Sequence, residues 1–338
     1  MKNFLTKIAF LLFGCALMLF FIPGLYDYAQ NDLVRFKTIK DKISEIRPEN
    51  HNLYFLGNSV VMCGINGNLI ADSLHLSPGN IDSLFNFSSP GQNILESIVI
   101  ADQINTGNSI YGFGFTINDL FNDTIIIEHS KKLAFYNYNF TPRDETLDYL
   151  SQQFDPQLAE IYDAPFFINS FASRGIVLTS FNSLIRNVIR KGSLNMKRAY
   201  TDLKYPMPYT DKVPDEKLSV LLSKKYAGVT RKNSAIPEKN VQLLNWITAH
   251  FRNKGDRIFF YILPDHPYLQ NLSGSDYYDK LDEQLKNISG SNSVPIFNFS
   301  LLFRDKTFFI DHTHNTREAA EILSNEMYYK LRNSGVLD

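Results

Sequence analysis

The chain contains little cysteine and almost no net charge, and each scarcity argues against a class of protein. Cys15 lies in a leader segment and Cys63 in the interior, and these are the two cysteines of 338 residues, so a disulfide framework is not expected. No Cys-x-x-Cys motif or His/Cys cluster has the spacing of a zinc site. The formal net charge of -1 leaves no basic footprint for nucleic acid. We therefore expect no metal, no cofactor and no nucleic-acid partner.

The amino-terminal segment contains a long apolar run. Lys2 and Lys7 precede an uncharged stretch from Ile8 to Pro23, and no good small-x-small cleavage site follows it. We expect an uncleaved transmembrane anchor over residues 1–25, with a cleaved signal peptide as the alternative. The lysines would hold the amino terminus in the cytoplasm, which predicts a single-pass protein of the cytoplasmic membrane whose main domain is extracytoplasmic.

The rest of the chain predicts an α/β domain that is interrupted by an insertion. Short apolar strands alternate with helices, a pattern typical of three layers around a mainly parallel sheet. A helical linker is expected over residues 26–49, and the α/β domain over 50–128 and 241–338. Residues 129–240 then form a largely helical insertion or cap, with expected helices at Leu147–Tyr162 and Ile176–Ile189. The insertion fits either a wall of a substrate pocket or a contact with a membrane partner, and its sequence does not choose between them.

Three predicted strands end in small or polar residues. The apolar run that starts at Asn52 ends in Gly57-Asn58-Ser59, the second strand leads to Gly91, and the third leads to Asn118. Ligands of open α/β sheets bind outside the carboxyl ends of the strands, so we expect these residues at one edge. Ser59 is then a candidate nucleophile. For the tripeptide alone, the alternative is a turn in which Ser59 is an ordinary helix N-cap.

Asp311 and His314 supply the groups that such a serine needs. A serine hydroxyl becomes a good nucleophile when an imidazole takes its proton and a carboxylate fixes the tautomer of that imidazole. The spacing Asp311-x-x-His314 places both on one turn, with His314 as the base and Asp311 as its partner. The backbone N–H groups of Ser59 and Gly91 and the side-chain amide of Asn118 would form an oxyanion hole.

Two further features concern the same carboxyl-terminal region. Asn315 and Glu318 have capping-box spacing, so the closing helix is expected to start there. His266 beside Asp265 is a second candidate base, and an ordinary loop histidine is the alternative.

These blocks, in this order, resemble the SGNH (GDSL-like) hydrolase superfamily. The resemblance covers about residues 50 to 130 and 255 to 335 and leaves the insertion outside it. It implies a flavodoxin-like SGNH fold, with Ser59 as nucleophile, His314 as base and Asp311 as its partner. It also implies an oxyanion hole formed by Ser59, Gly91 and Asn118. The sequence departs from the family pattern where Asn58 replaces the Asp of Gly-Asp-Ser, where the third block has extra residues before Asn118, and where Ala319-Ala320 replaces a usual Gly.

The anchor, the strand ending at Pro264 and the block Phe87–Gln92 look like anchored extracytoplasmic SGNH-like proteins that work beside membrane-bound O-acyltransferases. That likeness implies a bacterial source, a membrane-bound O-acyltransferase partner and a glycan or cell-wall polymer substrate. Polysaccharide O-acetylation and teichoic-acid D-alanylation are the reactions of such proteins. The leading expectation is a serine-dependent acyl transferase or esterase with an acyl-enzyme intermediate. The alternatives are a simple carbohydrate esterase or lipase, and a non-catalytic scaffold that binds polysaccharide or the acyltransferase.

Overall fold

The computed structural model describes residues 6–10, 13–14, 31–75, 81–104, 107–176, 182, 201–207, 211–225 and 235–337. The chain divides into two compact units, one of residues 1–44 and 126–201 and one of residues 45–125 and 202–338. Most of the predicted anchor and of the predicted helix Ile176–Ile189 lies outside the described residues. Within the described ranges, no helix combines the length and apolar character needed to span a bilayer.

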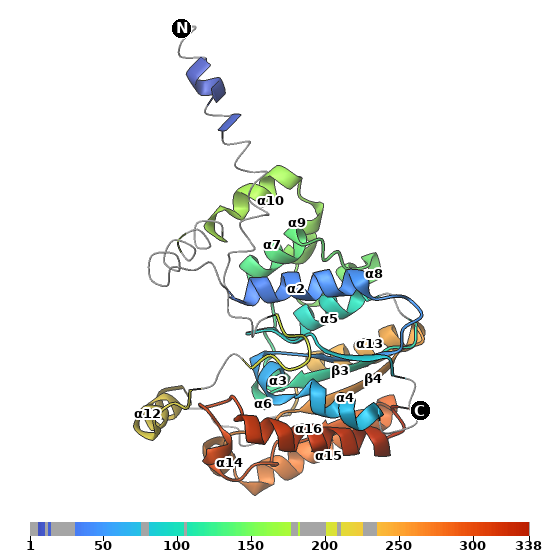
Figure 1. Cartoon of the computed structure of the whole chain (residues 1–338), viewed down its shortest axis with the longest axis vertical. Coiled ribbons are helices and arrows are strands. Elements are labelled where there is room, and N and C mark those ends of the chain that lie inside the picture. Colours follow the sequence, from blue (N-terminus) through green and yellow to red (C-terminus); the bar gives the residue numbers. More distant parts are fainter. Residues whose placement is uncertain are drawn as a thin grey trace. The chain divides into compact units, whose positions relative to one another are not determined.

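The larger unit is built on one parallel five-stranded sheet, as the alternating pattern predicted (Figure 1). The strand order is β2-β1-β3-β4-β5, and every neighbouring pair is parallel. The strands are β1 Asn52–Leu56, β2 Ser83–Asn86, β3 Ile110–Phe115, β4 Arg257–Ile262 and β5 Ile296–Asn298. Because β2 and β3 flank β1, the loops that follow these three strands lie side by side at the carboxyl edge of the sheet.

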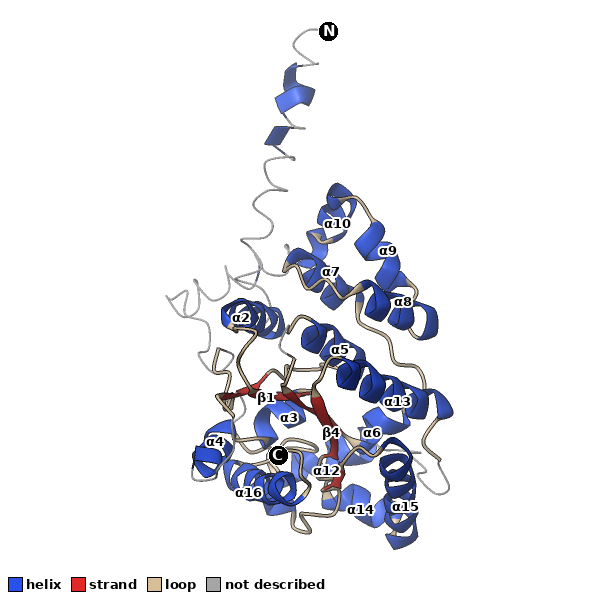
Figure 2. Cartoon of the chain, turned by 90° about the vertical axis from the view of Figure 1, so that its right-hand side faces the viewer, coloured by secondary structure: helices blue, strands red, loops and turns tan. Residues whose placement is uncertain are grey.

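Helices cover both faces of this sheet (Figure 2). Helices α3, α4 and α16 pack together on one face, and α5 and α13 pack on the other. The helices of this unit are α3 Ser59–Gly64, α4 Gly67–His75, α5 Ile94–Asp102, α6 Ile117–Phe121, α12 Asp215–Lys225, α13 Glu238–Asn253, α14 Pro267–Ser273, α15 Ser275–Asn292 and α16 Arg317–Asn333. A short 3-10 helix, η2, spans Lys306–Phe308.

Alternating side chains of the strands form two apolar layers. Leu53 and Phe55 of β1 belong to the core cluster that includes Leu323 of α16. Tyr54 points to the opposite face and stacks on Tyr111, whose ring in turn contacts Phe251 of α13. The strands are thus buried on both faces, which explains why they read as continuous apolar runs.

The smaller unit is helical. It contains α2 Asn31–Glu45, which the sequence predicted as a linker helix, together with α7 His129–Asn137, α8 Asp144–Gln153, α9 Gln157–Asp163 and α10 Phe166–Ala172. Phe36 of α2 packs edge-on against Phe135 of α7, with ring centroids 4.9 Å apart. A buried ion pair joins Lys132 to Asp155, with Nζ and Oδ1 2.7 Å apart. The unit therefore has its own apolar core and its own buried polar contact.

Three local predictions differ from the structure. The predicted helix Leu147–Tyr162 is two helices, because Pro156 forms the N-cap of α9 and interrupts the first. The closing helix is capped by Thr316, whose Oγ1 accepts from Ala319 N, so the predicted pair of Asn315 and Glu318 is wrong by one position. Residues 202–240, which the sequence joined to the insertion, belong to the compact unit that contains the sheet.

Candidate functional site

Ser59 begins helix α3 immediately after β1, at the carboxyl edge of the sheet. Gly57 makes this tight connection possible. It has φ +154°, and a Cβ there would lie 2.5 Å from Val61 Cγ2 and 2.8 Å from the carbonyl oxygen of Gly114. A residue with a side chain would therefore push α3 away from β3 and move Ser59 with it.

Asn58 caps α3 and ties it to the neighbouring helix α6. Its Oδ1 accepts from Val60 N at 2.9 Å, and its Nδ2 donates to Asp119 Oδ2 at 2.8 Å. Asp119 also accepts from the backbone N and the hydroxyl of Thr116. Burial raises the pKa of Asp119, and the hydrogen bonds from Thr116 oppose that rise. The carboxyl of Asp119 thus fixes the residue that precedes the candidate nucleophile.

The loop before α16 holds Asp311 and His314 in a closed turn. Ile310 N donates to His314 O at 2.8 Å, and an isolated antiparallel bridge joins Phe309 to Asn315. Asp311 Oδ1 accepts from the backbone N–H groups of Thr313 and His314, each at 2.8 Å. The three-residue spacing therefore lets one carboxyl group order both the loop and the side chain of His314.

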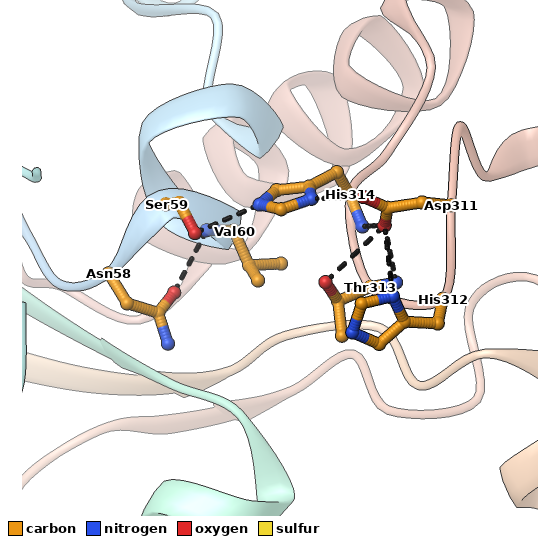
Figure 3. A network of polar contacts seen from close by, with 7 residues as sticks. All are labelled: Asn58, Ser59, Val60, Asp311, His312, Thr313 and His314. Atoms are coloured by element: carbon orange, nitrogen blue, oxygen red, sulfur yellow. Dashed lines mark hydrogen bonds and ion pairs between the residues drawn. The ribbon is translucent and has the colours of Figure 1, made fainter. Parts of the chain in front are cut away.

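The structure brings Ser59, His314 and Asp311 together (Figure 3). His314 Nδ1 lies 2.8 Å from Asp311 Oδ2, and His314 Nε2 lies 2.9 Å from Ser59 Oγ. A carboxylate only accepts hydrogen bonds, so in the neutral imidazole Nδ1 carries the proton and the lone pair of Nε2 faces the serine hydroxyl. This arrangement makes Nε2 the acceptor for the hydroxyl proton of Ser59. The catalytic roles assigned to the three residues remain predictions.

The carboxyl of Asp311 is held in its ionised form. Burial by itself would raise its pKa, but the hydrogen bond and charge of His314 and the backbone donors of Thr313 and His314 outweigh burial and keep the pKa well below the usual range. The side chains of Asp311 and His314 are 19% and 13% exposed, so the pair is shielded and still reaches the surface. An ionised Asp311 stabilises the imidazolium that forms when His314 accepts a proton.

Gly91 and Asn118 lie at the same edge of the sheet as Ser59, in the loop after β2 and in the first turn of α6. Both residues are exposed. Ser89 N donates to Gly57 O at 3.2 Å, which joins the loop of Gly91 to the loop of the nucleophile. The topology therefore places one candidate oxyanion donor on a loop and the other at the start of a helix, both at the sheet edge of Ser59, and their role as donors stays a prediction.

Two more histidines lie near Asp311. His312 Nδ1 is 3.9 Å from Asp311 Oδ1. His266 is 3% exposed, and its Nδ1 accepts from Tyr268 N at 3.1 Å. Burial, and to a smaller extent the electrostatic interaction with His312, lower the pKa of His266 to about 4, although Asp311 opposes the shift. The hydrogen bond from Tyr268 N and the lowered pKa favour a structural role for His266 as the N-cap of α14.

A cavity of about 490 Å³ adjoins the loop that carries Asp311 and His314. Its lining comprises Tyr205, Met207, Lys212, Ile310, Thr316 and Arg317. The first three come from residues 205–212, which the sequence analysis assigned to the insertion. This segment is tied to the site because Val213 N donates to Ile310 O at 2.8 Å. The described lining combines apolar side chains with two cationic ones and includes no carboxylate.

Sequence reasoning missed Asp119 and the cavity segment as parts of the site. Asp119 directly follows the predicted oxyanion residue, and its capping-box spacing to Thr116 was a local signal that could have identified it. Tyr205 and Lys212 carried no such signal, because their position depends on long-range contacts. Among the described residues, no group of His, Cys, Asp and Glu side chains is arranged to hold a metal ion.

Comparison with known proteins adds no family to this description. A scan against protein-family models and a search of curated proteins both find no match for the chain. The functional argument therefore depends on the geometry of the site.

Proposed function

We propose that the protein is a serine-dependent acyl transferase or esterase, with Ser59 as the nucleophile, His314 as the base and Asp311 as its orienting partner. The observation that carries the proposal is the continuous contact from Ser59 Oγ through His314 to Asp311, with both distances below 3 Å. A neutral imidazole between a hydroxyl and an ionised, shielded carboxylate is the arrangement that activates serine for attack on a carbonyl group.

In the proposed reaction, the hydroxyl proton of Ser59 moves to His314 Nε2 and back. Ser59 Oγ attacks the carbonyl carbon of an ester or thioester while its proton passes to His314 Nε2. The tetrahedral intermediate collapses, the bond to the leaving group breaks, and His314 returns the proton to that group. A hydroxyl of the acceptor, or water, then attacks the acyl-enzyme by the same route and regenerates Ser59. The backbone N–H groups of Ser59 and Gly91 and the amide of Asn118 are the proposed donors to the oxyanion.

We assign the fold to the SGNH type on two grounds. The sheet order β2-β1-β3-β4-β5, with every pair parallel, is that of flavodoxin-like folds. The nucleophile follows the first strand of the sheet, the two oxyanion candidates follow its two neighbours, and the base and its partner precede the last helix. The family likeness of the motifs and the topology of the sheet therefore point in the same direction.

The proposed substrates are acylated glycans or cell-surface polymers, outside the cytoplasmic membrane to which residues 1–25 anchor the chain. A membrane-bound O-acyltransferase is the proposed partner that supplies the acyl group. The cavity beside Ile310 and Thr316 supports a substrate with an apolar part and without excess positive charge. Exclusion of water from such a cavity would favour transfer to a sugar hydroxyl over hydrolysis.

Turnover of an activated ester tests this proposal. The full-length protein is incubated with para-nitrophenyl acetate, with and without a polysaccharide acceptor, beside the Ser59→Ala variant. We expect the wild-type protein to release nitrophenol and the variant to lose that release. Acetyl groups recovered on the acceptor would identify a transferase, and free acetate alone would identify an esterase. Equal nitrophenol release by the two proteins would contradict the role of Ser59.

A further inference from the structure

Helix α10 exposes its apolar face and buries its polar face. Four large apolar side chains of this short helix are exposed, namely Phe166 at 50%, Phe167 at 63%, Ile168 at 49% and Phe171 at 62%. In the rest of the described chain beyond the leader, exposed large apolar side chains occur singly or as one adjacent pair. A contiguous exposed apolar patch of this kind marks a surface that contacts something other than water.

Hydrogen bonds within the smaller unit fix this orientation. Asn169 is 3% exposed, and its Nδ2 donates to Ile161 O of α9 at 2.7 Å. Ser173 is fully buried, and its hydroxyl accepts from Asn137 Nδ2 of α7 at 3.1 Å. The polar side of α10 is thus bound to the unit, so rotation of the helix cannot bury the phenylalanines without breaking buried hydrogen bonds.

Arg174 and the basic sequence that follows α10 indicate the kind of surface that this helix fits. Arg174 follows the helix, and its guanidinium lies 4.1 Å from the centre of the Phe171 ring. From Pro165 to Thr201 the sequence has six Lys and Arg residues and no Asp or Glu, whereas the whole chain has 35 acidic residues among 338, about one in ten. Asp163 ends the preceding helix α9, so the acidic residues stop before α10 and the basic ones follow it. Exposed phenylalanines next to arginine and followed by a basic sequence are typical of elements that lie in an anionic lipid interface.

The same compact unit includes residues 1–44 and therefore the segment for which the sequence predicts a membrane anchor. A membrane anchor on this unit would make a bilayer available to an apolar face of the same unit. We propose that α10 lies in the interface of an anionic bilayer, with its phenylalanines at the acyl-chain boundary and Arg174 at the level of the phosphates. This second contact would fix the orientation of the smaller unit on the membrane, and it does not depend on the proposed chemistry of Ser59.

Fluorescence quenching by brominated lipids tests this proposal in the full-length protein. Trp246 is the only tryptophan of the chain, so Trp246→Phe provides a silent background for Phe167→Trp. The matched control is Gln152→Trp, at an exposed position of α8. Helix α8 lies apart from α10 in the same unit (Figures 1 and 2). Each variant is mixed with vesicles of phosphatidylcholine, or of phosphatidylcholine with phosphatidylglycerol, that contain brominated phosphatidylcholine.

We expect brominated lipid to reduce the emission at position 167 by roughly half, more strongly with phosphatidylglycerol, and to leave position 152 nearly unchanged. Absence of quenching at position 167 would overturn the proposal. Accessibility of that indole to iodide would then show a face open to water, and protection from iodide would show that protein covers it. Equal quenching at positions 167 and 152 would also overturn it, because the contact would not be specific to α10.

Discussion

His314 Nε2 lies 2.9 Å from Ser59 Oγ, although the two residues are 255 positions apart in the sequence. A separate local turn positions each of the two residues. Gly57 permits the tight turn that positions Ser59, and the carboxyl of Asp311 closes the turn that positions His314. The contact between them depends on the packing of α3 against α16, which belong to the same face of the sheet. The predictions below separate these contributions.

Asp311→Asn tests the orientation of His314. An amide can still accept hydrogen bonds from the backbone of Thr313 and His314, but it no longer favours the imidazole tautomer with a proton on Nδ1. We expect kcat for para-nitrophenyl acetate to fall roughly 10³- to 10⁴-fold while the melting temperature changes little. Asp305→Asn is the matched control, because Asp305 Oδ1 accepts from Thr307 N in a similar turn. A kcat within about threefold of the wild-type value would contradict this role of Asp311.

Asn58→Asp tests the contact between α3 and α6. The change would replace the donor to Asp119 Oδ2 by a second carboxyl group at a partly buried position. We expect a loss of about 1–3 kcal/mol in the free energy of unfolding near neutral pH. The loss should diminish as the pH falls, because the folded state then gains a proton that relieves the repulsion.

The double variant Asn58→Asp/Asp119→Asn is the control for that experiment, since it restores one donor and one acceptor. Chemical denaturation at two pH values measures all three proteins. A double variant no more stable than Asn58→Asp would show that the effect does not arise from this pair.

Gly57→Ala tests the close approach of α3 to β3. The added Cβ would lie 2.8 Å from a backbone oxygen of Gly114, which cannot rotate away. We expect a loss of about 1–3 kcal/mol in stability from steric overlap, together with the loss of esterase activity. Gly290→Ala in α15 is the control, because a Cβ there meets no atom within 4 Å and should stabilise the helix by roughly 0.5–1 kcal/mol. Equal stability of the two variants would show that the turn tolerates a side chain.

His266→Asn tests the protonation of a buried histidine. The folded-state pKa of about 4 lies below the ordinary value of 6.5, so between these pH values the unfolded chain binds a proton that the folded chain does not. The lowered pKa of His266 therefore makes the folded state more stable above about pH 6.5 than at lower pH. The difference in stability is lost as the pH falls towards 4. The asparagine side chain of the variant can still accept from Tyr268 N, and it does not bind a proton in this range.

Thermal melts at neutral pH and at about pH 4.5 measure the difference. We expect the wild-type melting temperature to fall more than that of His266→Asn. Parallel decreases in the two proteins would show that His266 is already protonated in the fold.

The sheet and the three residues of the candidate site could be predicted from local patterns. Short apolar runs with turn signals marked the strands, and polar residues after consecutive strands indicated their shared edge. The spacing of Asp311 and His314 was visible because both groups lie on one turn. The sequence did not show that Asn58 contacts Asp119, because that hydrogen bond joins loops after different strands.

The insertion was harder to predict. Tyr205 and Lys212 lie in a proline-rich stretch without apolar periodicity. This stretch joins the sheet unit through backbone hydrogen bonds such as that from Val213 N to Ile310 O. Pro156 is a local signal for the end of a helix. The sequence analysis still predicted one helix there, because the apolar periodicity is similar on both sides of Pro156. The inverted polarity of α10 became visible only when the burial of Asn169 and Ser173 showed which face points inward.

Covalent labelling of the full-length protein with a fluorophosphonate tests the activated serine most directly. Intact mass is measured for the wild-type protein and for the Ser59→Ala and His314→Gln variants, after circular dichroism has shown that each is folded. We predict a single adduct on the wild-type protein, none on Ser59→Ala, and labelling slowed by roughly a thousandfold or more on His314→Gln. No adduct on the folded wild-type protein, or an adduct that persists in Ser59→Ala, would contradict the proposed function.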